Sequence, residues 1–260
     1  MGNYNILLVI MESNRHFTLV VIGDNPEELV RPYDNNIKVE PYKVYEFAKA
    51  KEYREQYITF YESLLKSKKL TDSEMESINN ALEYYHSLDD IDFYLELTSG
   101  NELDPETGDL MSDQNPNGKY DTCHIGKNLS MPLINKNGEE VFSARKKDID
   151  WNKIHLANKE VYERTWEMIM EGDKPKTDDE KTIYDNMKNR TAYFEFFGTK
   201  DRYVLNSTAF WGYAVLDQKN GWRELEDNMS QIDWVSNFYD NFIKPLPENT
   251  RISIYECFRK

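Results

Sequence analysis

The sequence has 260 residues, of which 39% are hydrophobic and 13% aromatic, so it can form a folded core and disorder of the whole chain is excluded. No apolar run reaches the ~20 residues that a membrane helix needs, and the first residues lack the basic start of a secretory signal. Two cysteines, Cys123 and Cys257, are too few for a disulfide framework or a four-thiolate zinc site, and we expect a soluble protein of a reducing compartment.

Most of the net charge of −15 lies in one segment of the chain. Residues Thr71–Gly118 hold 13 acidic side chains and no lysine or arginine. This charge disfavours direct binding of nucleic acid and favours a cation or a basic protein surface, although solubility explains an acidic face equally well. If the segment binds a partner, we expect the acidic surface to consist of Asp72, Glu76, Glu83, Asp89, Asp90 and Asp92.

The first third of the chain predicts strands followed by a helix. Apolar runs rich in β-branched residues predict buried strands at 5–10 and 17–22, with a turn at 23–26. Residues 44–65 have helical spacing of their apolar side chains. The apolar face of this helix is expected to consist of Tyr53, Tyr57, Phe60 and Leu64.

A capping box at Thr71–Glu74 predicts the start of a second helix, because the two side chains can satisfy each other's free backbone amides. Its apolar side is expected to consist of Met75, Ile78, Leu82 and Tyr85. Periodicity leaves open whether residues 91–97 form a strand or a helix. Residues 100–118 predict a long polar loop.

The second half of the chain mixes helices and strands. The predicted helices are those at about 156–170, 177–188 (opened by a second capping box, Thr177–Glu180) and 232–242. The predicted strands are those at 192–197, 202–205, 209–216 and 251–257, with a turn at Asn206-Ser207.

These elements together predict an α+β fold, in which a mainly antiparallel sheet has helices packed on one face. We expect a single domain over residues 1–260, with an acidic helix-and-loop insertion at about 71–118. A candidate subdivision lies near 171–176.

Several short motifs follow one another along the chain. They are His16–Glu28, Asn115–Asp121, Lys147–Trp151, Phe210–Gly212, Leu246–Thr250 and Ile254–Cys257. In this order they resemble an uncharacterised family of bacteriophage, prophage and bacterial proteins. The resemblance implies a phage setting, and with it the host cytoplasm, but it implies no mechanism.

The chain departs from the pattern of this family at two places. After Ile125-Gly126 the family continues Gly-Arg-Trp, whereas this chain has Lys127-Asn128-Leu129. The family ends its last strand Asp-Cys-His, whereas this chain has Glu256-Cys257-Phe258. We therefore expect no site built on that Arg and that His.

One loop has the spacing of a calcium site. Oxygen-bearing side chains alternate before and after Gly118 as in the first nine positions of an EF-hand loop, and the residues concerned are Asp113, Asn115, Asn117 and Asp121. His124 occupies the position of the usual bidentate Glu, and the same residue types form ordinary turns. We favour a plain turn, with a weak Ca²⁺ site as the alternative, and expect no other cofactor.

The sequence contains no complete catalytic motif. If the protein is an enzyme, the candidate catalytic residues are Asp121, His124 and His16. Cys123 lies beside His124, but neighbours in a strand point to opposite faces, so we do not expect them to form a Cys–His pair.

Basic and aromatic residues in two segments could hold a planar, anionic ligand such as a nucleotide. The candidate ligand-binding residues are Arg145, Lys147, Asp150, Trp151 and Trp211. The alternative, which we favour for the tryptophans, is that they belong to the core.

We therefore hypothesise a phage accessory protein that counteracts host antiviral defence, by binding an immune protein or by sequestering its nucleotide signal. The alternatives are a small enzyme acting on a nucleotide or related metabolite, and a minor virion-associated structural protein. We expect no direct nucleic-acid binding and no membrane association, and a homo-oligomer stays open.

Overall fold

The computed structural model describes residues 16–66, 70–126, 131–156, 158–226 and 229–259. The chain forms two compact units. We call Met1–Asn36 together with Asn117–Lys260 the sheet unit, and Ile37–Pro116 the helical unit. The strand expected at residues 5–10 lies outside the described residues.

The helical unit is one continuous insertion in the sheet unit. It begins at Ile37, well before the expected start at about residue 71, because the residues before 71 supply the strand and the helix that pack with the acidic segment. The expected subdivision near 171–176 lies inside the sheet unit.

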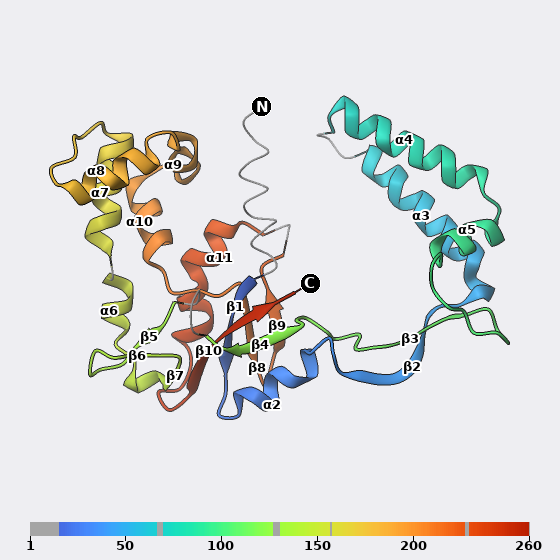
Figure 1. Ribbon diagram of the computed structural model, residues 1–260, viewed down its shortest axis with the longest axis horizontal. Coiled ribbons are helices and arrows are strands. Elements are labelled where there is room, and N and C mark those ends of the chain that lie inside the picture. Colours follow the sequence, from blue (N-terminus) through green and yellow to red (C-terminus); the bar gives the residue numbers. More distant parts are fainter. Residues whose placement is uncertain (1–15, 67–69, 127–130, 157, 227–228, 260) are drawn as a thin grey trace. The chain divides into compact units, whose positions relative to one another are not determined.

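Within the described residues, the sheet unit contains a six-stranded sheet in the order β4-β10-β1-β8-β9, with β7 also paired to β10 (Figure 1). Its strands are β1 (His16–Ile22), β4 (Thr122–Ile125), β7 (Ser143–Arg145), β8 (Ala214–Asp217), β9 (Gly221–Glu224) and β10 (Arg251–Phe258). Strand β1 is parallel to β8, and the other neighbours are antiparallel. The α+β class is therefore confirmed, with a mixed and mainly antiparallel sheet.

The remaining elements of the sheet unit are short helices and one small pair of strands. In chain order they are α2 (Pro26–Val30), η1 (Arg31–Tyr33), β5 (Leu133–Ile134), β6 (Glu140–Val141), η3 (Lys146–Asp148), α6 (Trp151–Leu156), α7 (Lys159–Met170), α8 (Asp178–Met187), α9 (Thr191–Phe197), α10 (Lys200–Thr208), α11 (Gln231–Phe238) and the π-helix η4 (Tyr239–Ile243).

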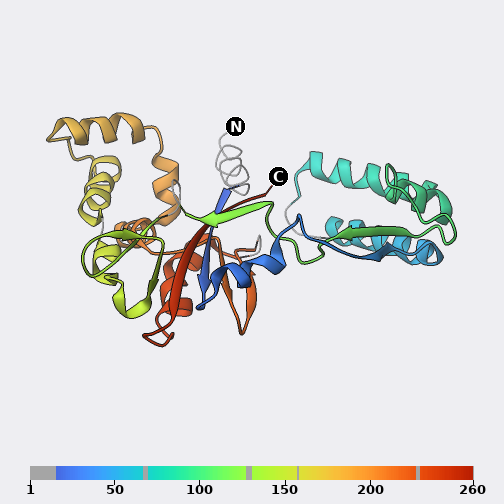
Figure 2. The ribbon, with the colours of Figure 1, turned by 60° about the horizontal axis from the view of Figure 1, so that its bottom comes forward.

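Side-chain alternation along the strands gives the sheet two buried faces. On one face Val20 and Ile254 pack with Phe238 of α11, in a cluster that also includes residues of α6 and η4. On the other face Leu19 and Tyr255 pack with Val30, so the short helix α2 covers the side opposite α11. Strand β10 runs between β1 and β4 through the middle of this arrangement (Figure 2).

Two predicted strands, 192–197 and 202–205, are wrong, because these residues form helices α9 and α10. Thr199 starts α10 by accepting a hydrogen bond from the backbone of Arg202 at 3.3 Å. The aromatic side chains of α9 pack around Tyr203, and the ring centres of Phe194 and Tyr203 are 5.0 Å apart. Aromatic residues on adjacent positions mimic the composition of a strand, whereas the capping contact is local and specific to a helix.

The strand expected at 209–216 is also shorter than predicted, and the turn expected before it is absent from the described structure. Asn206 and Ser207 lie inside α10 and form no turn, and of residues 209–216 only those from Ala214 onward pair with β1. The predicted closing strand 251–257 is confirmed as β10.

The expected helix at about 156–170 is confirmed as α7, which begins at Lys159, and a separate short helix, α6, ends at Leu156; the helix opened by Thr177 is confirmed as α8. Thr177 caps α8 by accepting from the backbone of Glu180 at 3.1 Å, but the carboxylate of Glu180 does not return the contact. It accepts instead from the backbone of Lys176 at 2.6 Å and from Nε of Arg164 at 3.1 Å. Arg164 also contacts Asp173 at 2.6 Å, so this one guanidinium fastens the connection between α7 and α8.

Among its described residues, the helical unit contains two paired strands, three α-helices and one short 3-10 helix. Its elements are β2 (Lys38–Tyr45), η2 (Phe47–Lys49), α3 (Ala50–Leu65), α4 (Asp72–Ser87), α5 (Asp90–Leu97) and β3 (Leu110–Gln114). The antiparallel pairing of β2 with β3 corrects two expectations, because residues 44–45 end a strand and residues 110–114 of the expected loop form one.

Aromatic side chains hold the three helices of this unit together. Tyr57 of α3 contacts Phe93 of α5 at 5.4 Å between ring centres, and Tyr85 of α4 contacts the same ring at 5.7 Å. The capping box at Thr71 is confirmed, and the open question at residues 91–97 is settled as helix. Phe60 is an exception on the expected apolar face of α3, since it is 57% exposed.

Among the described residues, the helices are too short or too polar to cross a lipid bilayer.

Candidate functional site

Three neighbouring strands bring a row of polar residues to one face of the sheet. Glu256 of β10 lies opposite Thr18 of β1 and opposite His124 of β4. Because side chains alternate along a strand, Glu256 shares its face with Ile252 and Ile254, which are fully buried. The polar row is thus the continuation of an apolar core face.

Glu256 is nine-tenths buried, with 8% of its surface exposed. Its Oε2 is sealed from solvent and receives no hydrogen bond from the described residues. An imidazole approaches each carboxylate oxygen: Nε2 of His124 is 3.8 Å from Oε2, and Nδ1 of His16 is 3.9 Å from Oε1. These distances are too long for hydrogen bonds, so neither imidazole satisfies the carboxylate.

A pocket of about 300 Å³ opens over this carboxylate. Its lining residues are His16, Phe17, Thr18, Met131, Trp211, Gly212, Tyr213 and Glu256. The rings of Phe17 and Tyr213 contact each other in the cluster on the opposite face of the sheet. The side chains that give this pocket its chemistry are therefore Glu256, His16, Thr18 and the indole of Trp211.

Gly212 lets the wall of the pocket approach the sheet. A Cβ atom added there would lie 2.8 Å from Cγ2 of Val20 and 3.1 Å from the carbonyl oxygen of Thr18. The glycine therefore allows the segment that carries Trp211 to lie directly against β1.

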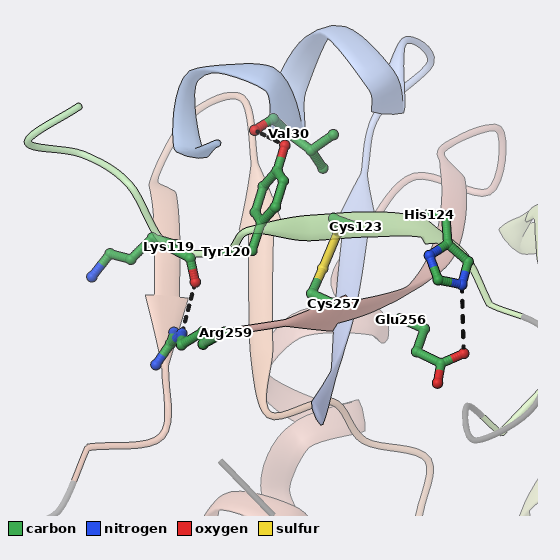
Figure 3. The surroundings of a disulfide bond; sticks show 8 residues. All are labelled: Val30, Lys119, Tyr120, Cys123, His124, Glu256, Cys257 and Arg259. Atoms are coloured by element: carbon green, nitrogen blue, oxygen red, sulfur yellow. Dashed lines mark hydrogen bonds and ion pairs between the residues drawn. A yellow bond between two sulfur atoms is a disulfide. The ribbon is translucent and has the colours of Figure 1, made fainter. Parts of the chain in front are cut away.

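On the opposite face of the same two strands, Cys123 of β4 and Cys257 of β10 form a disulfide bond, which holds His124 opposite Glu256 (Figure 3). The expectation that Cys123 and His124 point apart is confirmed. Two cysteines exclude a framework of several bonds but not this single one.

Close to the disulfide, Tyr120 anchors the start of β4. Its hydroxyl donates to the carbonyl oxygen of Val30 at 3.1 Å, and burial raises the pKa of Tyr120 to about 12. Nε of Arg259 donates to the carbonyl oxygen of Lys119 at 2.7 Å (Figure 3). These contacts fix the segment that leads into β4 and therefore the position of His124.

Two of the three candidate catalytic residues, His16 and His124, come together around Glu256, but Asp121 does not join them. Oδ1 of Asp121 accepts from the side chain of Asn35 at 3.3 Å, and its carbonyl oxygen accepts from Asn36 at 2.7 Å. Asp121 therefore helps to fasten the segment after η1.

The residues of the alternative calcium site are divided between the two units. Asp113 ends strand β3 in the helical unit and forms an ion pair with Lys38 at 2.7 Å, which lowers the pKa of Asp113. Asn117 and Asp121 belong to the sheet unit. Across the described residues, no group of three His, Cys, Asp or Glu side chains is placed to hold a metal ion.

Of the candidate ligand-binding residues, Trp211 lines the pocket, while Arg145, Asp150 and Trp151 have structural contacts. Arg145 donates to the carbonyl oxygen of Asn249, and Oδ1 of Asp150 accepts from the backbone of Lys153 at 3.1 Å. The indole of Trp151 packs at 5.4 Å from the ring of Phe210 in the core cluster.

Lys147 is exposed, and its backbone amide donates to the carbonyl oxygen of Glu248 at 2.9 Å. The five candidates therefore do not gather into one anionic-ligand site.

The predicted acidic surface is mostly exposed on α4 and α5. Asp89 caps α5 through hydrogen bonds from the backbones of Ile91 and Asp92, and Asp90 pairs with Arg54 at 3.3 Å. The remaining carboxylates of this set are exposed at Asp72, Glu76, Glu83 and Asp92.

Comparison with known proteins finds no match among protein-family models, among curated proteins or among solved structures.

Glu256 is the central residue of the pocket, and it is missing from the candidate residues chosen from the sequence. A signal for it exists: in the strand 251–257 a glutamate occupies the same face as Ile252 and Ile254. A charged residue on an otherwise apolar strand face needs a partner or a role.

Proposed function

We propose that this chain is a binding protein that takes up a small molecule in the pocket over Glu256. The observation that supports this is a nine-tenths-buried carboxylate that lines a pocket and whose Oε2 receives no hydrogen bond from the described residues. Burying such a group costs free energy unless a partner compensates it, and a bound ligand supplies that partner.

The phage-like motifs suggest which ligand to test first. In the setting that they imply, the ligand is a nucleotide-type signal of a host defence system, and the protein acts in the host cytoplasm by removing it. The pocket volume of about 300 Å³ lies at the small end of the range for small-molecule sites and suits one ring system.

Native mass spectrometry of the protein purified from host cells tests this proposal. We expect a small molecule to be retained by the wild-type chain and lost from Glu256→Gln, with Glu195→Gln, an exposed carboxylate on α9, as the matched control. A repeat with EDTA separates a metal-dependent ligand from a metal-independent one. The proposal fails if no mass is retained and no compound of a nucleotide and metabolite panel binds in titration.

An enzyme that acts on a nucleotide or related metabolite is the second candidate. The observation that favours it is the placement of two exposed imidazoles near one buried carboxylate, because a carboxylate can orient an imidazole for proton transfer. Incubation with nucleotides and product analysis by chromatography tests it. We expect turnover to disappear in His124→Ala and to persist in Asp121→Asn; turnover unaffected by His124→Ala would refute this candidate.

A further inference from the structure

The floor of the pocket offers hydrogen-bond acceptors side by side. Thr18 and Glu256 are directly opposed in the antiparallel pair of β1 and β10, so their side chains are neighbours on one face. Both residues line the pocket. An ionised carboxylate only accepts hydrogen bonds, and a hydroxyl can accept as well as donate. The floor therefore matches a ligand edge that carries more than one donor.

The imidazoles do not satisfy the carboxylate by themselves. Nδ1 of His16 and Nε2 of His124 stay 3.9 and 3.8 Å away, and both side chains are more than half exposed. Neither imidazole therefore competes with a ligand that reaches this carboxylate from the pocket, and a hydrogen bond to an ionised carboxylate is stronger than one between neutral groups.

The wall of the pocket supplies a flat surface. Trp211 lines it, is partly buried and packs against the apolar cluster on this face of the sheet, and Gly212 lets the segment that carries it lie against β1. Planar, nitrogen-rich groups stack on indole rings, and protonated ones gain a cation–π contribution.

We infer that the pocket recognises a planar group with adjacent N–H donors, such as the N1–H and 2-amino edge of a guanine base or a guanidinium group, through Glu256 and Thr18 on one side and Trp211 on the other. This inference rests on the proposed binding function and makes it specific, because it assigns recognition to the base of a nucleotide and not to its phosphates. A guanine base and a guanidinium compound share this edge, and the experiment separates the two sources.

Calorimetric titration of the wild-type protein with guanosine, inosine, methylguanidine and inorganic phosphate tests the inference. We expect guanosine to bind about tenfold or more tightly than inosine, which lacks the 2-amino group, because a paired donor edge is worth that much discrimination. If methylguanidine binds and guanosine does not, the pocket recognises the same pair of N–H donors, and the ligand is a guanidinium compound.

Substitutions of pocket residues test whether the compound binds in this pocket. Glu256→Gln keeps the shape of the side chain and removes its charge, so we expect it to lower the affinity for the bound compound about tenfold or more, whereas Glu195→Gln leaves the affinity unchanged. Trp211→Phe is a second variant, which retains an aromatic ring, and we expect it to lower the affinity several-fold. Thermal unfolding checks that each variant is folded.

Two kinds of failure are distinguishable. The first is that a ligand is retained in native mass spectrometry but the pocket does not recognise a donor edge. Equal affinities for guanosine and inosine, competition by phosphate for guanosine binding, or unchanged binding to Glu256→Gln would each show this. The inference is then overturned and the binding function stands. If no ligand is retained and none of the four probes or the wider panel binds, the binding function itself is overturned.

Discussion

Oε2 of Glu256 lies 3.8 Å from Nε2 of His124, across two antiparallel strands at directly opposed positions. A shift of about 1 Å would convert this approach into a hydrogen bond. The strand pair holds the two groups close without joining them, so a ligand that moves either side chain can complete the contact.

Replacing Glu256 by an apolar residue should abolish ligand binding without lowering the stability of the protein. Glu256→Met continues the apolar row of Ile252 and Ile254. Because replacing a buried charge with an apolar side chain is often neutral or stabilising, we expect a free energy of unfolding equal to or about 1 kcal/mol above that of the wild type. Chemical denaturation measures it, and ligand retention should be lost. A decrease of more than about 1 kcal/mol would mean that the carboxylate mainly supports the fold.

The bond between Cys123 and Cys257 should stabilise the sheet unit. The two residues are 134 positions apart in the chain, and closing a loop of this length restricts the unfolded state, so we expect Cys257→Ser to lower the free energy of unfolding by about 2–4 kcal/mol. Denaturation with and without a reducing agent measures this. The double variant Cys123→Ser with Cys257→Ser serves as the control, since a reductant cannot affect it.

Thiol titration of the unreduced, denatured protein decides whether the bond is present. Two free thiols in protein purified from a reducing cytoplasm, together with no effect of the reductant on stability, would contradict this prediction.

Gly212 should be intolerant of a side chain. In Gly212→Ala the new methyl group would meet Val20 and the backbone of β1, so we expect a loss of about 1–3 kcal/mol in the free energy of unfolding and weaker ligand binding. Gly172→Ala is a comparison without a clash, because a Cβ there meets no atom within 4 Å; a loss of stability there would come from its left-handed φ of +80°, which Gly212 does not share. Equal stability and equal binding in wild type and Gly212→Ala would rule out this close approach.

His155 should make the protein less stable in mild acid. Burial lowers the pKa of His155, with Asp240 acting weakly in the opposite direction, and Nε2 of His155 has no hydrogen-bond partner in the described part of the chain. The unfolded chain binds a proton near the ordinary value of 6.5 while the folded chain resists it, so stability falls as the pH drops below about 6.5.

We expect His155→Gln to lose less stability than the wild type between pH 7.5 and 5.5, because glutamine does not titrate. Denaturation curves at both pH values measure the difference. Parallel curves for the two proteins would show that His155 does not contribute.

Arg164 should protect the connection between α7 and α8 from proteolysis. Its guanidinium contacts carboxylates on both sides of residues 171–176, and these contacts raise the pKa of Arg164 further above its already high ordinary value. We expect Arg164→Met to be cleaved in this connection faster than the wild type under limited proteolysis. Arg202→Met, which removes an exposed ion pair with Asp233 at 3.5 Å, should be cleaved as slowly as the wild type.

Local signals in the sequence identified several elements correctly. The capping contacts of Thr71 and Thr177 involve residues within three positions, so they can be recognised without knowledge of the fold. Strand β1 also follows from composition, because a central strand that is buried on both faces forms a nearly continuous apolar run, and β10 is recognisable from its isoleucines and aromatic residues.

The errors lie where distant contacts override local preference. Residues 43–45 belong to β2 because Lys43 pairs with Met111 and Tyr45 with Leu110, more than 60 positions away, and the aromatic stretch of α9 is helical because it packs on Tyr203. The pocket could be predicted only in part for the same reason. His16 and His124 were identifiable as reactive residue types, but their relation to Glu256 depends on strand register, which brings β4 and β1 to either side of β10.

The position of β10 also sets an order of events during synthesis. This strand pairs with β1, β4 and β7, yet it is the last of the described strands to leave the ribosome. The contacts within residues 37–116 can form much earlier, whereas β4 and the β10-facing edge of β1 must wait for residues 251–258. A nascent chain of this protein therefore passes through a stage in which one unit is complete and the other still has an unpaired strand, the stage at which chaperones and proteases have most access to it.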